Sequence, residues 1–381
     1  MSKTHPPPPR LRFRDLGIGI GSLPVGGTNS INDVPNVTTG HATVWRDEPP
    51  PPDGRGVART GVTAIVPFEP AALFDDRVPV GVAVLNGAGE LTGSLAMSEW
   101  GVLETPVFLT STMAVGRVFD GAITELVDGA PRIGVEDAII PVVGECDDGL
   151  LNYSRIVQVD VSDVGRALLD ARARGSGRVV EGVIGAGTGM VCFELKGGIG
   201  SSSRCVGPWV VGVMVLANFG LLDRLTIDGV PVGRNLIERG WAGEHVSLRR
   251  RHEQGSCIGV VASNAPLSPD QLSRVARRAG LGLARTGSFA GHYSGEIFLA
   301  FSTGVRMPRK AEGAVVEIPR VAEEHLDGLF EAVVDATEEA VLNCLCAADT
   351  VTGTGGMTVP GLPLNLVVEI LRAHGKPASL P

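Results

Sequence analysis

Short runs of β-branched and aliphatic residues recur along the chain, and glycine turns bound most of them. Several runs are apolar at nearly every position, which is typical of strands that are covered on both faces. We therefore expect buried sheets with further layers on either side. The predicted strands span residues 62–66, 78–85, 179–184, 210–216, 258–262 and 297–301.

Apolar residues recur at helical spacing in other segments. Ser268-Pro269-Asp270-Gln271 is a capping box with proline at the first helical position, which predicts a helix over 269–280. A second helix is predicted over 322–346, where an apolar stripe, interpreted as core, lies beneath an acidic face. After a Gly- and Pro-rich loop over 351–363, a short final helix is predicted over 364–374. The stripe consists of Leu326, Leu329, Val333, Ala336 and Ala340.

The composition is that of a folded globular chain. Of 381 residues, 44% are hydrophobic and 20% are charged, which suffices for a large core. A net charge of −9 argues against an electrostatic nucleic-acid surface. The one basic run, 249–252, is interpreted as a solvated linker end rather than a protease-recognition or nucleic-acid patch. The most apolar stretch, 209–222, is too short and interrupted to span a membrane.

Six cysteines show neither a C-x-x-C pair nor a histidine at metal spacing, so we expect no structural zinc, no other metal and reduced thiols. Residues 1–12 are Pro-rich and lack the apolar core of a signal peptide. We expect a disordered lead-in over 1–12, a single domain over 13–381 and a cytoplasmic location.

Familiar catalytic signatures fail. Gly185 to Gly189 follow a predicted strand, but the third glycine of a dinucleotide-binding G-x-G-x-x-G falls on Met190, so that match is weak. The chain has no P-loop, no H-E-x-x-H motif and no G-x-S-x-G elbow.

Gly255-Ser256 lies directly before the predicted strand 258–262, an arrangement expected of a precursor that cuts itself. Glycine offers an unhindered carbonyl that the serine hydroxyl can attack to form an ester. The cut would free a Ser256 α-amine with an ordinary pKa of about 7.7 to 8.0, low enough to act as a base. A loop Gly-Ser pair is a common alternative, so the dipeptide alone does not decide.

Ser294 and Glu296 lead into the predicted strand 297–301. Residues two apart on a strand share a face, so the hydroxyl and the carboxylate can form a relay. Glu296 would orient Ser294 or hold the Ser256 amine, and Ser294 would pass protons or donate to an oxyanion. A polar strand start with a solvated glutamate is the alternative.

An ordered series of motifs covers nearly the whole chain. The motifs are Asn29-Ser30-Ile31-Asn32-Asp33-Val34-Pro35 with Gly40-His41, Arg59 to Thr63, Leu85-Asn86-Gly87-Ala88-Gly89-Glu90, Glu104-Thr105-Pro106, Gly185 to Gly189, Lys196 to Gly200, Gly255-Ser256, Ser294-Gly295-Glu296 and Phe301 to Gly304. On these motifs the chain resembles the self-processing L-aminopeptidase/D-esterase and β-peptidyl aminopeptidase family of N-terminal-nucleophile hydrolases.

The resemblance implies an α/β fold, a four-layer αββα sandwich, cut into an α chain of 1–255 and a β chain of 256–381 that stay packed together. It implies that Ser256 is the nucleophile and that Ser294 and Glu296 are its partners. Asn218 matches an asparagine that stabilises the oxyanion, and Glu145 matches an acid that holds the ammonium group of the substrate. The same resemblance implies a homo-oligomer, a tetramer of processed heterodimers.

The function implied is that of a serine aminopeptidase that releases N-terminal residues, including D- or β-amino acids, from short peptides, amides or esters without a cofactor. The chain departs from some members at Leu150, where they carry a tyrosine that can donate to the oxyanion or the substrate. Two other functions fit the sequence: an uncleaved protein that binds small molecules, and a processed acyltransferase or cyclase of a biosynthetic pathway.

Overall fold

The chain folds into two sheets that lie face to face. The computed structural model describes residues 11–241, 254–311 and 313–381. One sheet has the order β1-β2-β5-β6, and the other has the order β13-β3-β12-β11-β10-β9, with β4 beside β3. The strands are β1 (Val37–Arg46), β2 (Ala58–Pro67), β3 (Asp76–Gly87), β4 (Val102–Leu103), β5 (Val107–Ser111), β6 (Val142–Cys146), β9 (Gly198–Val206), β10 (Trp209–Asn218), β11 (Gln254–Ser263), β12 (Tyr293–Ser302) and β13 (Met307–Pro308). Two small hairpins pair β7 (Val191–Cys192) with β8 (Leu195–Lys196) and β14 (Val351–Thr352) with β15 (Thr358–Val359).

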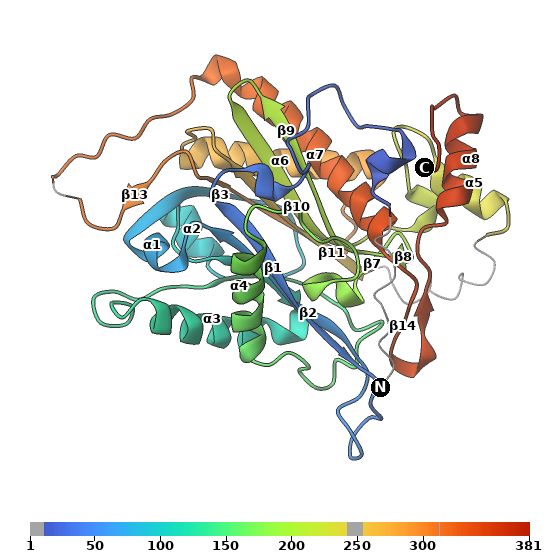
Figure 1. The fold of residues 1–381 in the computed structure, drawn as a ribbon, viewed down its shortest axis with the longest axis horizontal. Coiled ribbons are helices and arrows are strands. Elements are labelled where there is room, and N and C mark those ends of the chain that lie inside the picture. Colours follow the sequence, from blue (N-terminus) through green and yellow to red (C-terminus); the bar gives the residue numbers. More distant parts are fainter. Residues whose placement is uncertain (1–10, 242–253, 312) are drawn as a thin grey trace.

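Helices cover the outer face of each sheet (Figure 1). α6 and α7 pack on the larger sheet, and α4, with α3 beside it, packs on the smaller one. Separate hydrophobic clusters fill the space between the two sheets and the space beneath each helical layer. This is the predicted αββα order. The helices are α1 (Pro70–Asp75), α2 (Ser94–Trp100), α3 (Val115–Gly129), α4 (Ser162–Arg174), α5 (Val232–Glu238), α6 (Pro269–Thr286), α7 (Leu326–Ala347) and α8 (Leu364–Ala373).

Five of the six predicted strands are confirmed within β2, β3, β10, β11 and β12, but the strand predicted over 179–184 is wrong. This segment makes only a single bridge, from Gly182 to Ile199, and turns into a 3₁₀ helix, η4 (Gly185–Gly189). Gly182 has a φ of 80°, a left-handed conformation that a β-branched run does not favour. The glycines of η4 are buried against neighbouring backbone, so they form no open phosphate loop.

The three predicted helices are confirmed as α6, α7 and α8, and α6 continues six residues beyond the predicted end. The apolar stripe of α7 is core, as predicted. Its predicted acidic face is confirmed at Asp327 and Glu331, which are exposed, but is wrong further along the helix, where Asp335, Glu338 and Glu339 are buried. Arginines from other elements approach these carboxylates: Arg285 pairs with Asp335 and Glu338, while Arg204 pairs with Glu339.

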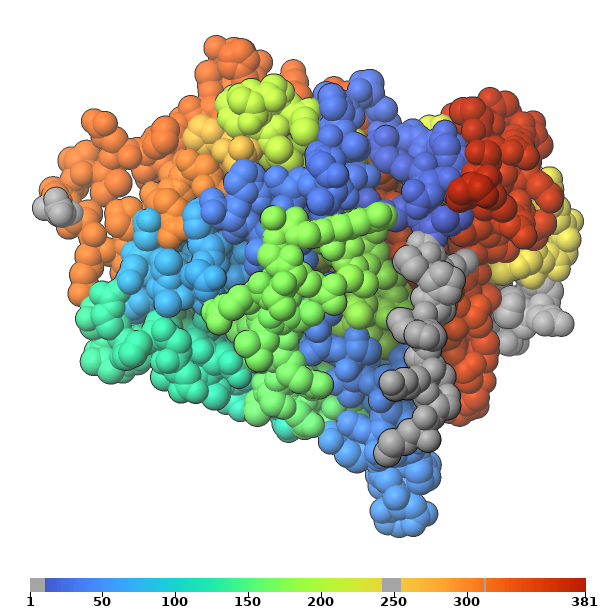
Figure 2. Space-filling model, viewed as in Figure 1, coloured from blue at the N-terminus to red at the C-terminus, as the bar shows by residue number. Residues whose placement is uncertain are grey.

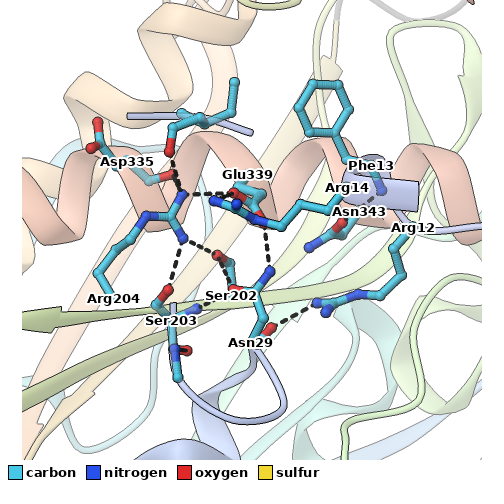
Figure 3. A network of polar contacts seen from close by, with 12 residues as sticks. Arg12, Phe13, Arg14, Asn29, Ser202, Ser203, Arg204, Asp335, Glu339 and Asn343 are labelled. Carbon is cyan, nitrogen blue, oxygen red and sulfur yellow. Dashed lines mark hydrogen bonds and ion pairs between the residues drawn. The ribbon is translucent and has the colours of Figure 1, made fainter. Parts of the chain in front are cut away.

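A buried polar network joins α7 to β9 and to the N-terminal segment (Figure 3). The Arg204 side chain is fully buried, and its guanidinium donates to Glu339 Oε2 at 2.7 Å and to Ser202 Oγ at 2.8 Å. Arg14 pairs with the other oxygen of Glu339, to which Asn29 also donates. The Asn29 motif therefore has a structural role, because it fixes the N-terminal segment to α7.

Residues 1–10 of the predicted lead-in and the basic run 249–252 lie outside the described residues. Arg12, at the end of the lead-in, is 6% exposed and pairs with Glu181 at 2.6 Å. The folded part therefore begins earlier than residue 13. In the space-filling view, the described N-terminal residues (blue) lie against the C-terminal segment (red) (Figure 2). The Ser379 backbone N–H donates to the Leu16 carbonyl at 2.8 Å.

Across the described ranges, no helix is long and apolar enough to cross a membrane. All six cysteines have free thiols, and five of them are buried.

Candidate active site

Ser256 lies on β11, in the middle of the larger sheet. Asn218 of β10 is opposite Ser256 on one side, and Gly295 of β12 is opposite on the other. The side chain contacts the Cys146 thiol of β6, which belongs to the smaller sheet, so Ser256 points into the space between the sheets. The next residue, Cys257, packs in the cluster beneath the helices. Strand alternation therefore places the serine at the sheet interface and the cysteine on the opposite face.

A cavity of about 500 Å³ opens in front of Ser256. Asn218 and Glu145 also line it, so the structure brings together three of the predicted site residues there. The acidic side chains of Asp147 and Glu194 share this lining with Glu145, which makes the cavity suited to a cationic group. Its other lining residues include Ala88, Gly89, Thr112, Met113, Leu150, Val191, Phe219, Gly220, Gly255 and Tyr293.

Asn218 ends β10, and two backbone groups hold its side-chain amide. Its Oδ1 accepts from the Val191 N–H at 2.8 Å, and its Nδ2 donates to the Asp147 carbonyl at 2.9 Å. This network fixes which end of the amide is nitrogen. An amide nitrogen has two hydrogens, so a second one is left to donate to a developing charge.

The peptide group between Met190 and Val191 is itself held from behind. Lys196 is fully buried, and its ammonium donates to the carbonyls of Met190, Gly187 and Gly197 at 2.7, 3.1 and 2.9 Å. Because the Met190 carbonyl and the Val191 N–H belong to one peptide unit, Lys196 positions the group that orients Asn218. Sequence reasoning gave Lys196 no role, because a lysine within Lys-Gly-Gly carries no sign of burial.

Glu145 is 4% exposed, at the end of β6. Its Oε1 accepts from the Glu90 N–H at 2.9 Å, and its Oε2 accepts from the Thr112 hydroxyl. Burial raises the pKa of Glu145, although these hydrogen bonds oppose the shift. Thr112 and the Glu90 backbone were not foreseen, since neither is near Glu145 in the sequence. These two donors hold the Glu145 carboxylate in the lining of the cavity.

Ser294 and Glu296 form the predicted pair, with the serine hydroxyl donating to Glu296 Oε1. In the strand register they lie opposite Gly255 and Cys257, not opposite Ser256. A Cβ placed on Gly255 would be 3.1 Å from Ser294 Oγ. The pair therefore flanks the Gly255-Ser256 peptide from the face opposite to the Ser256 side chain. Burial raises the pKa of Glu296.

Asn86, from another motif, supports this pair. Its amide donates to the carbonyls of Gly291 and Ser294 at 2.8 and 2.5 Å, which pins the loop before β12. The loop and the strand that carry Ser294 are thus fixed from β3.

The two thiols nearest Ser256 are poor competitors for its role. Burial raises the pKa of both Cys146 and Cys257 well above the ordinary thiol value. A neutral thiol is a weak nucleophile. Neither thiol belongs to the lining of the cavity, whereas Ser256 does, which makes the Ser256 hydroxyl the candidate nucleophile.

Leu150 lines the cavity, so the departure from the tyrosine-bearing members lies at the site itself. Tyr153, three residues on, packs against Gly56 and does not line the cavity. Tyr293, which sequence reasoning passed over, does line it and is 55% exposed.

Within the described residues, no group of three or more His, Cys, Asp or Glu side chains is placed to hold a metal ion.

Comparison with known proteins shows the family of the chain. The sequence model of peptidase family S58 matches residues 29–359. The chain belongs to peptidase family S58. Two β-peptidyl aminopeptidases BapA are relatives of this S58 chain. The one from Sphingosinicella xenopeptidilytica is 39% identical over 95% of the chain and 91% of the relative. The one from Sphingosinicella microcystinivorans is 37% identical over 97% of the chain and 93% of the relative.

Solved structures give the same result for the S58 fold. The PH0078 protein of Pyrococcus horikoshii superposes with a TM-score of 0.88 at 38% identity, covering 96% of this chain and all of that one. The L-aminopeptidase D-Ala-esterase/amidase of Ochrobactrum anthropi, described as a variant of the Ntn-hydrolase fold, has a TM-score of 0.85 at 35% identity, covering 96% and 99%. The predicted family and fold class are confirmed, and the S58 chain is a hydrolase of the aminopeptidase class.

Proposed function

We propose that the chain is a self-processing serine aminopeptidase that cuts itself between Gly255 and Ser256 and then releases N-terminal residues from short peptides, amides or esters. One observation carries the proposal. The Ser256 hydroxyl faces the acidic cavity, while the Ser294-Glu296 pair flanks the Gly255-Ser256 peptide from the other face. Nucleophile, ammonium site and proton relay thus meet at one peptide bond.

In the cut, the Ser256 Oγ attacks the Gly255 carbonyl. The O–C bond forms, the C–N bond to Ser256 breaks, and the hydroxyl proton passes to the freed nitrogen. Water then hydrolyses the ester and separates the two chains. The new α-amine appears beside Ser294, whose hydroxyl is oriented by Glu296. This placement favours a role of Ser294 and Glu296 in holding the Ser256 amine over a role of Ser294 as a donor to the oxyanion.

In turnover, the neutral amine accepts the Ser256 proton as the hydroxyl attacks a substrate carbonyl. The Asn218 N–H stabilises the oxyanion, and the protonated amine then gives its proton to the leaving group. Glu145 holds the ammonium group of the substrate, which limits cleavage to the first residue.

Asn218→Ala is expected to lower kcat by about 10²- to 10³-fold with little change in KM, because the donor acts mainly in the transition state. Steady-state kinetics on an amino-acid p-nitroanilide measures this. Asn235→Ala is the matched control, since the Asn235 amide lies outside the cavity and donates to the exposed Pro231 carbonyl at the start of its own helix. An equal loss in both variants would remove Asn218 from the mechanism.

Glu145→Gln is expected to raise KM about 10- to 100-fold, because a charge-assisted hydrogen bond to the substrate ammonium is lost. As pH falls, the Glu145 carboxylate takes up a proton and KM rises. Because the pKa of Glu145 is raised, this happens at a higher pH than for an ordinary glutamate. KM of the variant should lack this dependence. Glu296, whose pKa is also raised, would still act on kcat. The pH profile of KM for both proteins decides the point.

Denaturing electrophoresis with N-terminal sequencing tests the proposed function as a whole. Purified protein should give two fragments, one of them beginning Ser-Cys-Ile-Gly, and should release p-nitroaniline without an added amine acceptor. A lasting single band near 39.6 kDa together with absent hydrolysis would leave the small-molecule-binding alternative. Turnover that requires an acceptor would favour the acyltransferase.

The assembly and location are proposals that rest on the family resemblance. We propose that the α chain (1–255) and β chain (256–381) stay packed together, form a tetramer and work in the cytoplasm. The cut falls within β11, and residues 256–263 after it pair with β10 before it in one sheet, which supports a stable processed heterodimer. Light scattering of the processed protein measures its mass.

A further inference from the structure

A second cavity, of about 230 Å³, lies next to the first, and its described lining residues carry no acidic side chain. Gly220, Gly255 and Tyr293 line both cavities, so the Gly255-Ser256 peptide stands at their boundary. Among the residues that the structure describes, no Asp, Glu, Lys or Arg lines the second cavity. Its other lining residues are Leu221, Ser288, Phe289, Ala290, Gly291, His292 and Ser294.

Aromatic side chains form the outer wall of this second cavity. Phe289 is 66% exposed and Tyr293 is 55% exposed, although burial of rings this large is favourable. The Tyr293 ring packs edge-on against His292, with centroids 4.6 Å apart, and the Arg224 guanidinium lies 5.7 Å from the Phe289 centroid. These contacts hold the Phe289 and Tyr293 rings in place, and part of the apolar surface of each ring stays exposed.

The backbone fixes the loop that carries this wall. The loop follows α6 at Gly287, whose φ is 110° and where a Cβ would come within 1.9 Å of the Arg224 carbonyl. Thr226 donates to the Thr286 carbonyl at 2.9 Å, and Asn86 holds Gly291. A wall anchored at both ends can select among ligands by shape.

The proposed chemistry determines which end of a substrate each cavity takes. Glu145 and Asn218 place the ammonium group and the acyl carbonyl in the first cavity. The leaving amine needs the proton of the Ser256 α-ammonium, and that group appears where Gly255 was joined, beside Ser294. When the C–N bond of the substrate breaks, the leaving group therefore lies at the boundary, facing the second cavity.

We propose that the second cavity is the subsite for the leaving group and that Phe289 makes it prefer a neutral aromatic or apolar second residue. This inference rests on the proposed function. Before the cut, the Gly255-Ser256 peptide bond lies between the two cavities. Once this bond is cut, the two cavities form one substrate cleft.

The test uses processed enzyme and two dipeptides that share an N-terminal residue and carry Phe or Gly as the second residue. The ratio of their kcat/KM values should favour Phe by at least about 10-fold, as expected for a large apolar side chain in a pocket. In Phe289→Ala the ratio should fall at least about five-fold. Trp45→Ala is the matched control, because Trp45 is also exposed, stacked under Arg59 at 3.8 Å, and outside both cavities. Its ratio should equal that of the wild type.

A second readout separates the subsite from general damage. Added phenylalanine amide and glycine amide compete with water for the shared acyl-enzyme, and an acceptor binds where a leaving group departs. Phe289→Ala should lower the transfer ratio of phenylalanine amide to glycine amide by the same factor. Hydrolysis with both ratios unchanged would overturn the subsite alone, whereas an uncut, inactive chain would overturn the proposed function and this inference with it.

Discussion

Ser256→Ala is expected to remain a single chain of 39.6 kDa and to lose hydrolysis by at least about 10⁴-fold. Both losses have one cause, because the same hydroxyl attacks Gly255 in the precursor and the substrate in the processed enzyme. The buried thiols Cys146 and Cys257 cannot replace it, since burial raises the pKa of each. Electrophoresis over several days and a p-nitroanilide assay measure the two effects.

Ser273→Ala provides the matched control, since Ser273 lies on α6, outside the cavity, and its hydroxyl donates to the Pro269 carbonyl of that helix. It should be cut and active like the wild type. Ser256→Cys keeps a nucleophile at the same position and should regain some cleavage. A Ser256→Ala protein that still yields the fragment starting at residue 256 would show that a protease makes the cut.

Arg204→Met is expected to lower the free energy of unfolding by about 3–5 kcal/mol, because it leaves the fully buried Glu339 without one of its two cations. Burial raises the pKa of Glu339, but hydrogen bonds from Arg14 and the charges of Arg204 and Arg14 outweigh it and leave that pKa lowered. The pair therefore contributes stability above the ordinary glutamate pKa and loses it as pH falls through the lowered value. Urea unfolding at neutral pH measures the change.

Arg172→Met tests whether burial is the cause. Arg172 pairs with Glu69 at 3.2 Å, but both side chains are about two-thirds exposed, so water screens the pair. Its unfolding free energy should match that of the wild type within error. A loss from Arg204→Met as small as that from Arg172→Met would contradict the structural role of the network in Figure 3.

The sequence predicted the long central strands and the helices with strong periodicity, because burial on one or both faces leaves a local pattern. It missed α3 and α4 and mistook 179–184 for a strand. That segment has the composition of a strand, but Gly182 turns it, and Glu181 pairs with Arg12 from the far N-terminus. Asp335, Glu338 and Glu339 of α7 look solvated in sequence, but they are buried, and arginines from distant segments compensate their charge.

The sequence by itself determined the family and, through the resemblance, the αββα fold and the candidate cleavage site, because the motifs follow one another in a fixed order along the chain. The apolar runs indicated buried sheets with layers on either side. Tertiary structure decided what surrounds that site. Contacts between segments far apart in sequence fix Glu145 through Thr112 and Glu90, and Asn218 through Val191 and Asp147. The strand register set Ser294 opposite Gly255 and Glu296 opposite Cys257, rather than opposite Ser256. Such pairings depend on how strands meet in space, which no local pattern encodes.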